Sequence, residues 1–381
     1  MALLLALVIV RAESAAAQAP YNLWAHSNLV ATTVNHFDVK KRNPDERAKM
    51  LKSLGIAKFA YNWREPDVPK FDEEIAALKR NGIELRGWML YGADNPHTKT
   101  ILEAFKQYNV RPYFWVYYGG ESKKAQDTFP SPEKHEQRLN AETDKLEALA
   151  KLASPYDVKV LLYNHNGWWG MVENQLALIE RLRQRGVTGV GLVYNFTHAR
   201  DEVHDDSNIF ATLWPKMKPY VAQVNITGMN IDDVTKIKYP SQGDGEVEMM
   251  RIIQDSGWRG TIGIPAERGG EDVNDAAETL KNYIVGIDWI AAELKQPGSG
   301  GPRPFSPARE RTLSLRYSSG RARHFCRPPT ERHVFRWTSL KVWTNVPDII
   351  EIQAGTHEPQ GPQHLRLPRG HPVHQVPWAY A

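Results

Sequence analysis

Short apolar runs alternate with longer amphipathic stretches along most of the chain, and this alternation constrains the fold more than any other feature of the sequence. The apolar runs have the length and the residue types of buried strands. Strands that alternate with helices favour parallel pairing and right-handed crossovers. The predicted strands are residues 23–26, 56–61, 83–90, 111–117, 158–163, 189–194, 220–226 and 260–264.

Each of these runs is followed by a stretch with helical periodicity, and several of the helices end at a glycine, where a positive φ is needed. Eight strand–helix units in about 270 residues predict an α/β fold with a single (β/α)8 TIM barrel over residues 20–296. A doubly wound open sheet is the main alternative, but no glycine-rich phosphate loop follows residues 23–26. The predicted helices are residues 44–54, 71–80, 99–108, 134–152, 173–185, 208–217, 246–256 and 272–294.

The first 19 residues are expected to form a separate segment. Residues 2–10 are an uninterrupted apolar run, and Ala17-Gln18-Ala19 fits the small-residue pattern of a signal-peptide cleavage site. The run is too short to span ~30 Å of hydrocarbon. We therefore expect a signal peptide at residues 1–19, a secreted or periplasmic protein, and no membrane span. The alternative for this segment is a buried strand or helix.

Residues 297–381 differ sharply from the rest of the chain. They hold 12 of the 25 prolines, and their 12 basic and 5 acidic residues give a net charge of +7, whereas residues 1–296 carry −3. The alternation of strands and helices stops there. Two interpretations stay open for this irregular tail: a disordered basic extension, or the product of a shifted reading frame. The single Cys326 permits no internal disulfide.

In a TIM barrel, the carboxyl ends of the strands meet at one mouth and carry the chemistry. The predicted strand ends are rich in Trp, Tyr, His and Asn. Flat apolar ring faces and neutral amides suit a polyhydroxylated ring, so we expect a small carbohydrate as the ligand. Packing in the core is the alternative role for each tryptophan. The candidate substrate-binding residues are Trp63, Trp115, Asn164, Trp168, Trp169, Asn195 and Asn225.

Three of these strand ends resemble a known family. The segments AKFAYNWRE (57–65), LYNHNGWWG (162–170) and VYNFTH (193–198) are similar to the sugar phosphate isomerase/epimerase family, whose members are xylose isomerase-like TIM barrels of the endonuclease IV superfamily. The resemblance covers residues 20–300 and is greatest to an exported bacterial branch. It implies a barrel fold, but it leaves the reaction open because this superfamily hosts isomerases, lyases and nucleases.

The resemblance also implies a divalent metal at the barrel mouth, held by Glu, Asp, His and Glu from strands five to eight. Three of the four positions depart from that pattern, because they hold amides where ligands are expected. Two alternatives stay open: a site for Mn, Co, Mg or Zn, or a site without a cofactor. The candidate metal ligands are His165, His198 and Glu267, with Asn195 or Asn225 assisting.

Isomerisation of a sugar requires a base that removes a proton next to a carbonyl, and a group that stabilises the enediolate. Glu267 and His165 are the candidate catalytic bases, with His198 as the alternative to His165, and Arg64 is the candidate cationic clamp. The alternatives are local ion pairs, Arg64 with Glu65 and Glu267 with Arg268. We expect an isomerase or epimerase of a monosaccharide or an oxidised sugar.

Two other functions stay open: a lyase or hydratase acting on a keto-sugar or glycoside, and a non-catalytic sugar-binding barrel that has lost its metal site. A nuclease requires several metal-ligating side chains and a basic groove. Because residues 1–296 are net negative, we expect no nucleic-acid partner.

Overall fold

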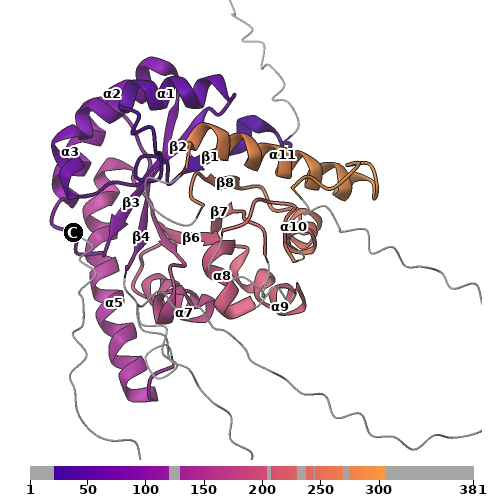
Figure 1. Cartoon of the computed structure of the whole chain (residues 1–381). Helices are drawn as coiled ribbons and strands as arrows, with labels where there is room; N and C mark the ends of the chain where they lie inside the picture. The colour runs from indigo at the N-terminus through magenta and orange to yellow at the C-terminus, as the bar shows by residue number, and fades with distance from the viewer. Residues whose placement is uncertain are drawn as a thin grey trace, which may run out of the picture. The chain divides into compact units, whose positions relative to one another are not determined.

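A computed structural model describes residues 21–119, 129–203, 207–229, 237–243, 245–268 and 274–305. The predicted signal peptide and residues 306–381 of the predicted tail lie outside this part of the chain. Eight parallel strands form a closed barrel in the order of the sequence, which confirms the predicted TIM barrel (Figure 1). The strands are β1 (Leu29–Thr32), β2 (Lys58–Tyr61), β3 (Glu84–Tyr91), β4 (Tyr113–Tyr117), β5 (Val160–Tyr163), β6 (Val190–Asn195), β7 (Val221–Asn225) and β8 (Thr261–Pro265).

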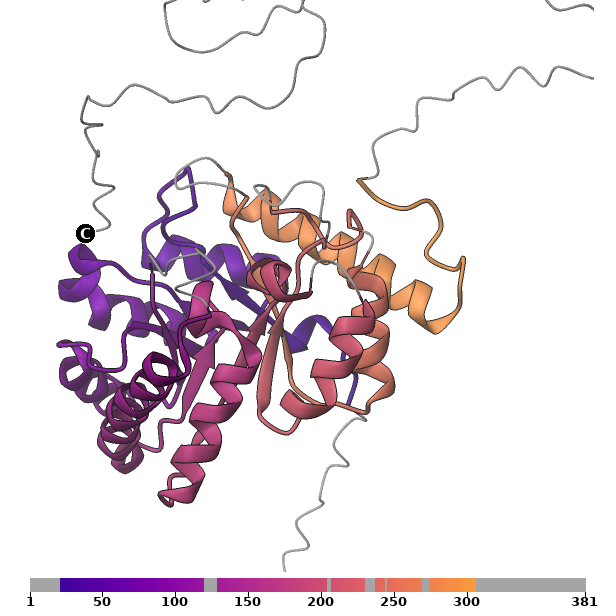
Figure 2. The same ribbon diagram turned by 90° about the horizontal axis from the view of Figure 1, so that it is seen from below.

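Helices surround the barrel on its outside (Figure 2). Among the described residues, no helix is both long and apolar enough to cross a membrane. The helices are α1 (Pro44–Ser53), α2 (Phe71–Asn81), α3 (Thr98–Tyr108), α5 (Pro132–Ala153), α6 (Gly167–Gly170), α7 (Val172–Gln184), α8 (Phe196–Val203), α9 (Ser207–Met217), α10 (Glu246–Asp255) and α11 (Ala276–Lys295), with short 3-10 turns η1 (His26–Asn28), η2 (Glu65–Lys70) and η3 (Ser154–Tyr156).

Local sequence explains several of the helix ends. Asn43 accepts a hydrogen bond from the backbone of Glu46, whose carboxylate accepts one from the Asn43 backbone, so a capping box starts α1. Gly82 ends α2 with a φ of 72°, as its predicted role requires. A glycine at the end of a helix lets the chain turn sharply and enter the next parallel strand.

The first strand lies later in the chain than the sequence predicted. The predicted strand at 23–26 is wrong, because this segment forms turns that are fixed by hydrogen bonds from the Asn28 amide to Leu23 and Gly260. The fully buried run Leu29–Thr32 pairs with both β2 and β8 and closes the barrel. His26 therefore lies at the amino end of β1, where it contacts Asp288, and not at the barrel mouth.

Aromatic rings lie inside the barrel, toward the carboxyl ends of its strands. Trp115 on β4 stacks on Tyr163 of β5 with ring centroids 6.1 Å apart and an interplanar angle of 9°. Gly87 on β3 makes room for this indole, since a Cβ there would lie 2.6 Å from the Trp115 ring. The two rings form the floor on which the residues of the barrel mouth rest.

Residues that follow α11 contact the rest of the barrel. Residues 297–305 return to the segment between β7 and α10, where Ser241 bonds to the carbonyl of Pro304 at 3.2 Å and Gln242 bonds to that of Phe305 at 3.2 Å. Trp289 of α11 donates to the carbonyl of Gly301 at 3.2 Å. The first residues after α11 therefore pack against the barrel.

Candidate active site

The hydroxyl of Tyr163, at the end of β5, lies at the centre of the barrel mouth. The side-chain amide of Asn195, from the end of β6, donates a hydrogen bond to this hydroxyl. Burial raises the pKa of Tyr163 well above its usual range; the amides of Asn195 and Asn225 oppose this rise, and the negative charge of Glu267 adds to it. The ends of β5, β6, β7 and β8 therefore converge on one phenol. Tyr163 is not among the candidate residues named from the sequence, although its position two residues after inward-facing Leu161 could have indicated it.

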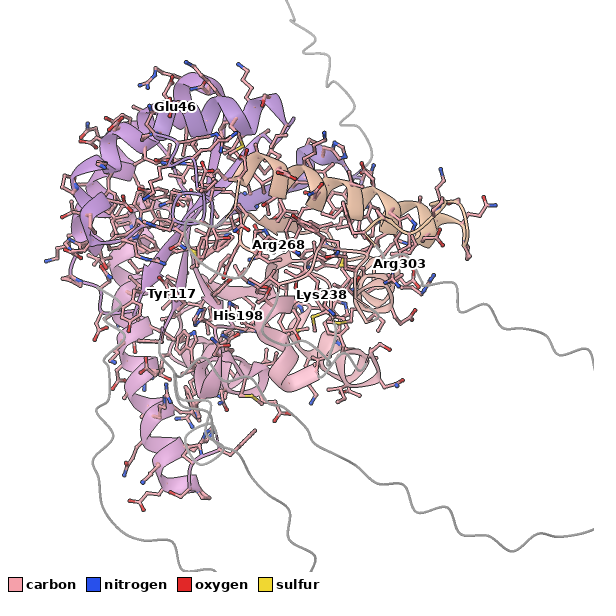
Figure 3. All side chains as sticks on the ribbon, viewed as in Figure 1. Glu46, Tyr117, His198, Lys238, Arg268 and Arg303 are labelled. Carbon is pink, nitrogen blue, oxygen red and sulfur yellow. The ribbon has the colours of Figure 1, made fainter. Side chains whose placement is uncertain are left out.

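Two imidazoles lie beside this tyrosine. The ring centroids of His165 and His198 are 4.3 Å apart, and both rings contact Tyr163, at 6.1 and 5.5 Å. His165 follows β5, whereas His198 lies in the first turn of α8. Tyr117 of β4 lies 5.4 Å from the His165 ring. Tyr117 and His198, which both contact the Tyr163 ring, are labelled in Figure 3.

The hydrogen bond of His165 fixes the position of its proton. Nδ1 lies 2.9 Å from the carbonyl oxygen of Tyr118. Because a carbonyl oxygen can only accept, the neutral ring carries its proton on Nδ1, and Nε2 has the lone pair. The neutral imidazole is therefore in the tautomer that a general base requires.

Arg64 approaches the mouth from the other side, after β2. Its guanidinium donates to the side chain of Asn62 at 3.1 Å, and its backbone N–H donates to Asp67 at 2.9 Å. Its positive charge opposes the rise in the Tyr117 pKa that burial causes, which places the guanidinium within electrostatic range of that hydroxyl. Glu65, the expected partner of Arg64 in a local ion pair, contacts His97 at 2.9 Å.

Glu267 and Arg268 follow β8. The guanidinium carbon of Arg268 lies 3.9 Å from the centroid of the Tyr239 ring, and its Nη1 donates to Gln242 at 3.5 Å. The Glu267 carboxylate acts electrostatically on Tyr163 and on Tyr283. Arg268 is therefore turned toward the segment between β7 and α10, while Glu267 lies within electrostatic range of the barrel centre.

The three candidate asparagines bind neighbouring protein groups. Asn164 accepts from the backbone N–H of Asn195 at 2.7 Å and donates to its carbonyl at 3.2 Å. The Asn195 oxygen accepts from the N–H of Thr197 at 2.9 Å, so Asn195 also caps α8. The Asn225 oxygen accepts from Gln223 at 2.7 Å. All three amide oxygens are therefore already used as acceptors.

The donor set does not fit the divalent metal that the resemblance implied. No group of three or more His, Cys, Asp or Glu side chains that could hold a metal is present among the described residues. The amides of Asn164, Asn195 and Asn225, at positions where ligands were expected, direct their oxygens at protein donors. Two imidazoles and one carboxylate can serve as metal ligands, but His165, His198 and Glu267 are not grouped closely enough to form such a site.

The candidate tryptophans contribute mainly to packing. Trp115, Trp168 and Trp169 are fully buried, and Trp63 is 8% exposed. Trp168 lies outside the barrel, where its Nε1 donates to His135 of α5 at 2.9 Å and Arg138 covers its ring. The Nε1 of Trp169 donates to the carbonyl of Tyr163 at 3.0 Å, and that of Trp63 to Met89 at 2.7 Å. The short helix α6 directs the adjacent pair of tryptophans into the core.

Polar groups after β1 complete the mouth and were missed because the first strand was predicted too early. Asn35 has a side-chain nitrogen and oxygen that are both buried without a hydrogen-bond partner among the described residues, and the hydroxyl of Thr33 is in the same state. His36 contacts Asp67 at 3.0 Å. Buried polar atoms without partners are rare, and they often mark the place where a ligand binds.

A search of family models found no match, and no curated protein matches the chain. Solved structures share its fold. A putative xylose isomerase from Rhodospirillum rubrum (TM-score 0.53, 16% identity) and 3-keto-D-glucoside 4-epimerase from E. coli (0.51, 16%) each align over 69% of this chain and 98% of their own. D-psicose 3-epimerase from Clostridium cellulolyticum H10 aligns over 69% of this chain and 99% of its own, with a TM-score of 0.50 and 14% identity. At these identities the likeness shows a shared TIM-barrel fold.

Proposed function

We propose that this chain is an enzyme of the sugar isomerase/epimerase type, which acts on a monosaccharide or an oxidised sugar by removing a proton next to a carbonyl. The observation that carries the proposal is the His165 imidazole at the barrel mouth, held by the Tyr118 carbonyl so that Nε2 has the lone pair. Proton abstraction by an oriented imidazole lies in the ordinary range of general base catalysis.

The residues around His165 supply the other parts of such a reaction. Nε2 of His165 takes the proton from carbon, and the electron pair moves onto the carbonyl oxygen to give an enediolate. The Arg64 guanidinium, across the mouth after β2, stabilises that negative charge. In an epimerisation, the carbon takes its new proton on the opposite face, on the side of the Glu267 carboxylate, because β8 and β5 are separated by two strands in the closed barrel. That proton comes from water, and the imidazolium of His165 gives its own proton back to the solvent. In an isomerisation, the imidazolium of His165 returns the proton to the neighbouring carbon.

The neutral side chains of the mouth support a carbohydrate substrate. The amides of Asn195 and Asn225 surround the Tyr163 hydroxyl, and Tyr117 adds a ring next to His165. Rings and amides at one rim suit the apolar faces and the hydroxyls of a sugar. Amides occupy three positions where the family resemblance implies metal ligands: Asn164, Asn195 and Asn225. No step of the proposed reaction requires a metal. The fold likeness to two named sugar epimerases agrees with the proposal but does not carry it.

We propose that the protein is secreted or periplasmic, because residues 2–10 form an apolar run like that of a signal peptide. Export would favour an unphosphorylated substrate. Determination of the N-terminal sequence of the protein, purified from cells that express the whole chain, tests this part. A mature terminus at Pro20 supports export, and an intact Met1 contradicts it.

The reaction is tested by incubating the protein in D2O with a panel of aldoses, ketoses, uronic acids and 3-keto-sugars, followed by NMR. Loss of the proton signal next to a carbonyl, with formation of an epimer or a ketose, supports the isomerase. Loss of water or of an aglycone from the same compounds supports a lyase or hydratase. Sugar binding without any deuterium exchange supports the non-catalytic barrel, which the engaged amides favour over a metalloenzyme. If no compound binds or exchanges, the carbohydrate account is wrong.

A further inference from the structure

A large aromatic side chain at the barrel rim is not used by the proposed reaction. Tyr91 ends β3 and is 53% exposed. Met89 of the same strand belongs to the inner cluster of the barrel, and Gly87 lies against inward-facing Trp115. Since alternate residues of a strand share one face, Tyr91 stands above Met89 on the side of the barrel mouth.

The Tyr91 ring is held in one orientation. It makes edge-to-face contacts with Tyr117 at 5.7 Å and with Tyr118 at 6.4 Å. Its backbone carbonyl accepts from Asn95 at 2.9 Å, and a Cβ at Gly119 would lie 3.1 Å from its ring. A ring that is fixed and yet half exposed loses little conformational entropy when a ligand stacks on it.

A row of rings connects Tyr91 to the proposed base. Tyr117 lies 5.7 Å from Tyr91 and 5.4 Å from His165, measured between ring centroids. Tyr91 therefore lies one ring further out than the residue that contacts His165. Tyr21, which is 40% exposed, differs from Tyr91, because its hydroxyl donates to the carbonyl of Gly260 before the start of β8. A single exposed tyrosine is common on protein surfaces and does not indicate a binding site. An exposed tyrosine in a row of rings that leads to the proposed base does indicate one.

Polar groups suitable for hydroxyls accompany the ring. Asp94 is in the loop after Tyr91, and its carboxylate lies 3.7 Å from the ammonium of Lys145 with 65% of its side chain exposed. Asn95 is in the same loop and holds the Tyr91 backbone. A fixed aromatic ring, followed by a loop that carries a carboxylate and an amide, with an ammonium beside the carboxylate, has the composition of a sugar subsite.

We propose that Tyr91 is the platform of a second subsite, which binds the non-reacting ring of a glycoside while the first ring lies at His165. The inference rests on the proposed function and narrows its substrate class from free monosaccharides to glycosides with two rings. The second ring stacks on Tyr91, and its hydroxyls reach Asp94 and Lys145.

Binding of matched sugars to the whole chain tests the proposal without requiring turnover. Glucose and maltose, and galactose and lactose, are titrated by calorimetry, and saturation-transfer NMR shows which ring contacts the protein. We expect the disaccharide of at least one pair to bind about tenfold more tightly than its monosaccharide, which is about 1.4 kcal/mol. Tyr91→Ala removes this difference and leaves the monosaccharide affinity unchanged, whereas Tyr91→Phe keeps it. Tyr21→Ala is the control for an exposed tyrosine at the other end of the barrel.

The outcomes separate this proposal from the proposed function. If Tyr91→Ala weakens both sugars equally, or neither, or if the disaccharide binds no more tightly than the monosaccharide in both pairs, the second subsite is wrong while a reaction seen in D2O still stands. If the wild-type protein binds no sugar of either pair and exchanges no proton, both proposals fail together.

Discussion

The side chain of Asn164 holds the backbone of Asn195 at both of its polar groups, by accepting from the N–H at 2.7 Å and donating to the carbonyl at 3.2 Å. Both residues are almost completely buried. His165 follows the first and α8, with His198, follows the second. This pair of hydrogen bonds therefore fixes the spacing of the two imidazoles that contact Tyr163.

Asn164→Ala is expected to lower the free energy of unfolding by about 2 kcal/mol, because it leaves the buried N–H of Asn195 without a partner. It is also expected to slow the proposed reaction by displacing His198. Urea denaturation and circular dichroism measure the first effect. Asn140→Ala, at an exposed position of α5, is the control and should change stability by less than about 0.5 kcal/mol. An unchanged midpoint for Asn164→Ala contradicts the structural role of this pair.

Gly263→Ala is expected to destabilise the barrel by about 3 kcal/mol, since the new Cβ would lie 1.8 Å from Oδ1 of Asn225 and 2.6 Å from Nε2 of Gln223. Gly189→Ala is a matched control in the loop that precedes β6, where a Cβ has nothing within 4 Å. The control should be neutral or slightly stabilising. Thermal melts of both variants check the prediction, and equal melting temperatures would show that Asn225 is not packed as described.

Trp168→Phe is expected to lower stability by about 1–3 kcal/mol, through the lost hydrogen bond to His135 and the smaller ring, while sugar affinity stays unchanged. This result would establish that the indole supports the helices outside the barrel. Chemical denaturation and sugar titration on the same preparation separate the two effects. A variant with wild-type stability and tenfold weaker sugar binding would contradict this prediction and show that Trp168 binds the substrate.

Glu202 of α8 makes stability depend on pH. One oxygen of its carboxyl accepts from the N–H of Val172 at the start of α7 at 3.1 Å. The other is buried and has no hydrogen-bond partner in the part of the chain that the structure describes. Burial raises the pKa of Glu202 to about 7, from an ordinary value of 4.5. Between these two pH values the folded protein binds the proton and the unfolded chain does not. Stability from this group is therefore present at low pH and lost as pH rises to about 7.

Glu202→Gln removes this dependence, because the amide keeps an acceptor for Val172 and carries no charge. The variant should be more stable than the wild type by about 3 kcal/mol at pH 8 and equal to it at pH 4.5. Urea unfolding at both pH values is the measurement. Glu180→Gln, on the exposed face of α7, should show no such difference. A Glu202→Gln gain that is the same at both pH values would mean that the carboxyl does not titrate as described.

The barrel could be predicted because each strand–helix unit has its own local pattern, as at Phe71–Asn81 with its glycine end. The exception was the first strand. Residues 23–26 and the true strand Leu29–Thr32 are both apolar, and only pairing with β2 and β8 distinguishes them. Because the first strand was placed too early, Asn35 and His36, which follow the true strand, were not named as candidate site residues. Periodicity alone does not show which of two neighbouring apolar runs closes a sheet.

The site was predicted less completely, because the sequence gives the strand ends but not the partners of their side chains. The imidazoles of His165 and His198 are brought together as their strand-end positions indicated. The asparagines are candidates for binding substrate, and in the structure they form hydrogen bonds to neighbouring strands. Asn164 accepts from the backbone N–H of Asn195, and the Asn195 amide donates to the Tyr163 hydroxyl. Trp168 is a candidate for binding substrate, and a four-residue helix turns its ring into the core. Such choices depend on tertiary contacts.

The central claim is that Nε2 of His165 removes a proton from a sugar carbon next to a carbonyl. The most direct test is the rate of deuterium incorporation at that carbon in D2O, for the sugar that the panel identifies, with wild-type protein, His165→Gln and the remote control His26→Gln. We predict a loss of at least about 100-fold for His165→Gln, in the range of a lost general base, and an unchanged rate for His26→Gln. Exchange by His165→Gln at the wild-type rate would contradict the account.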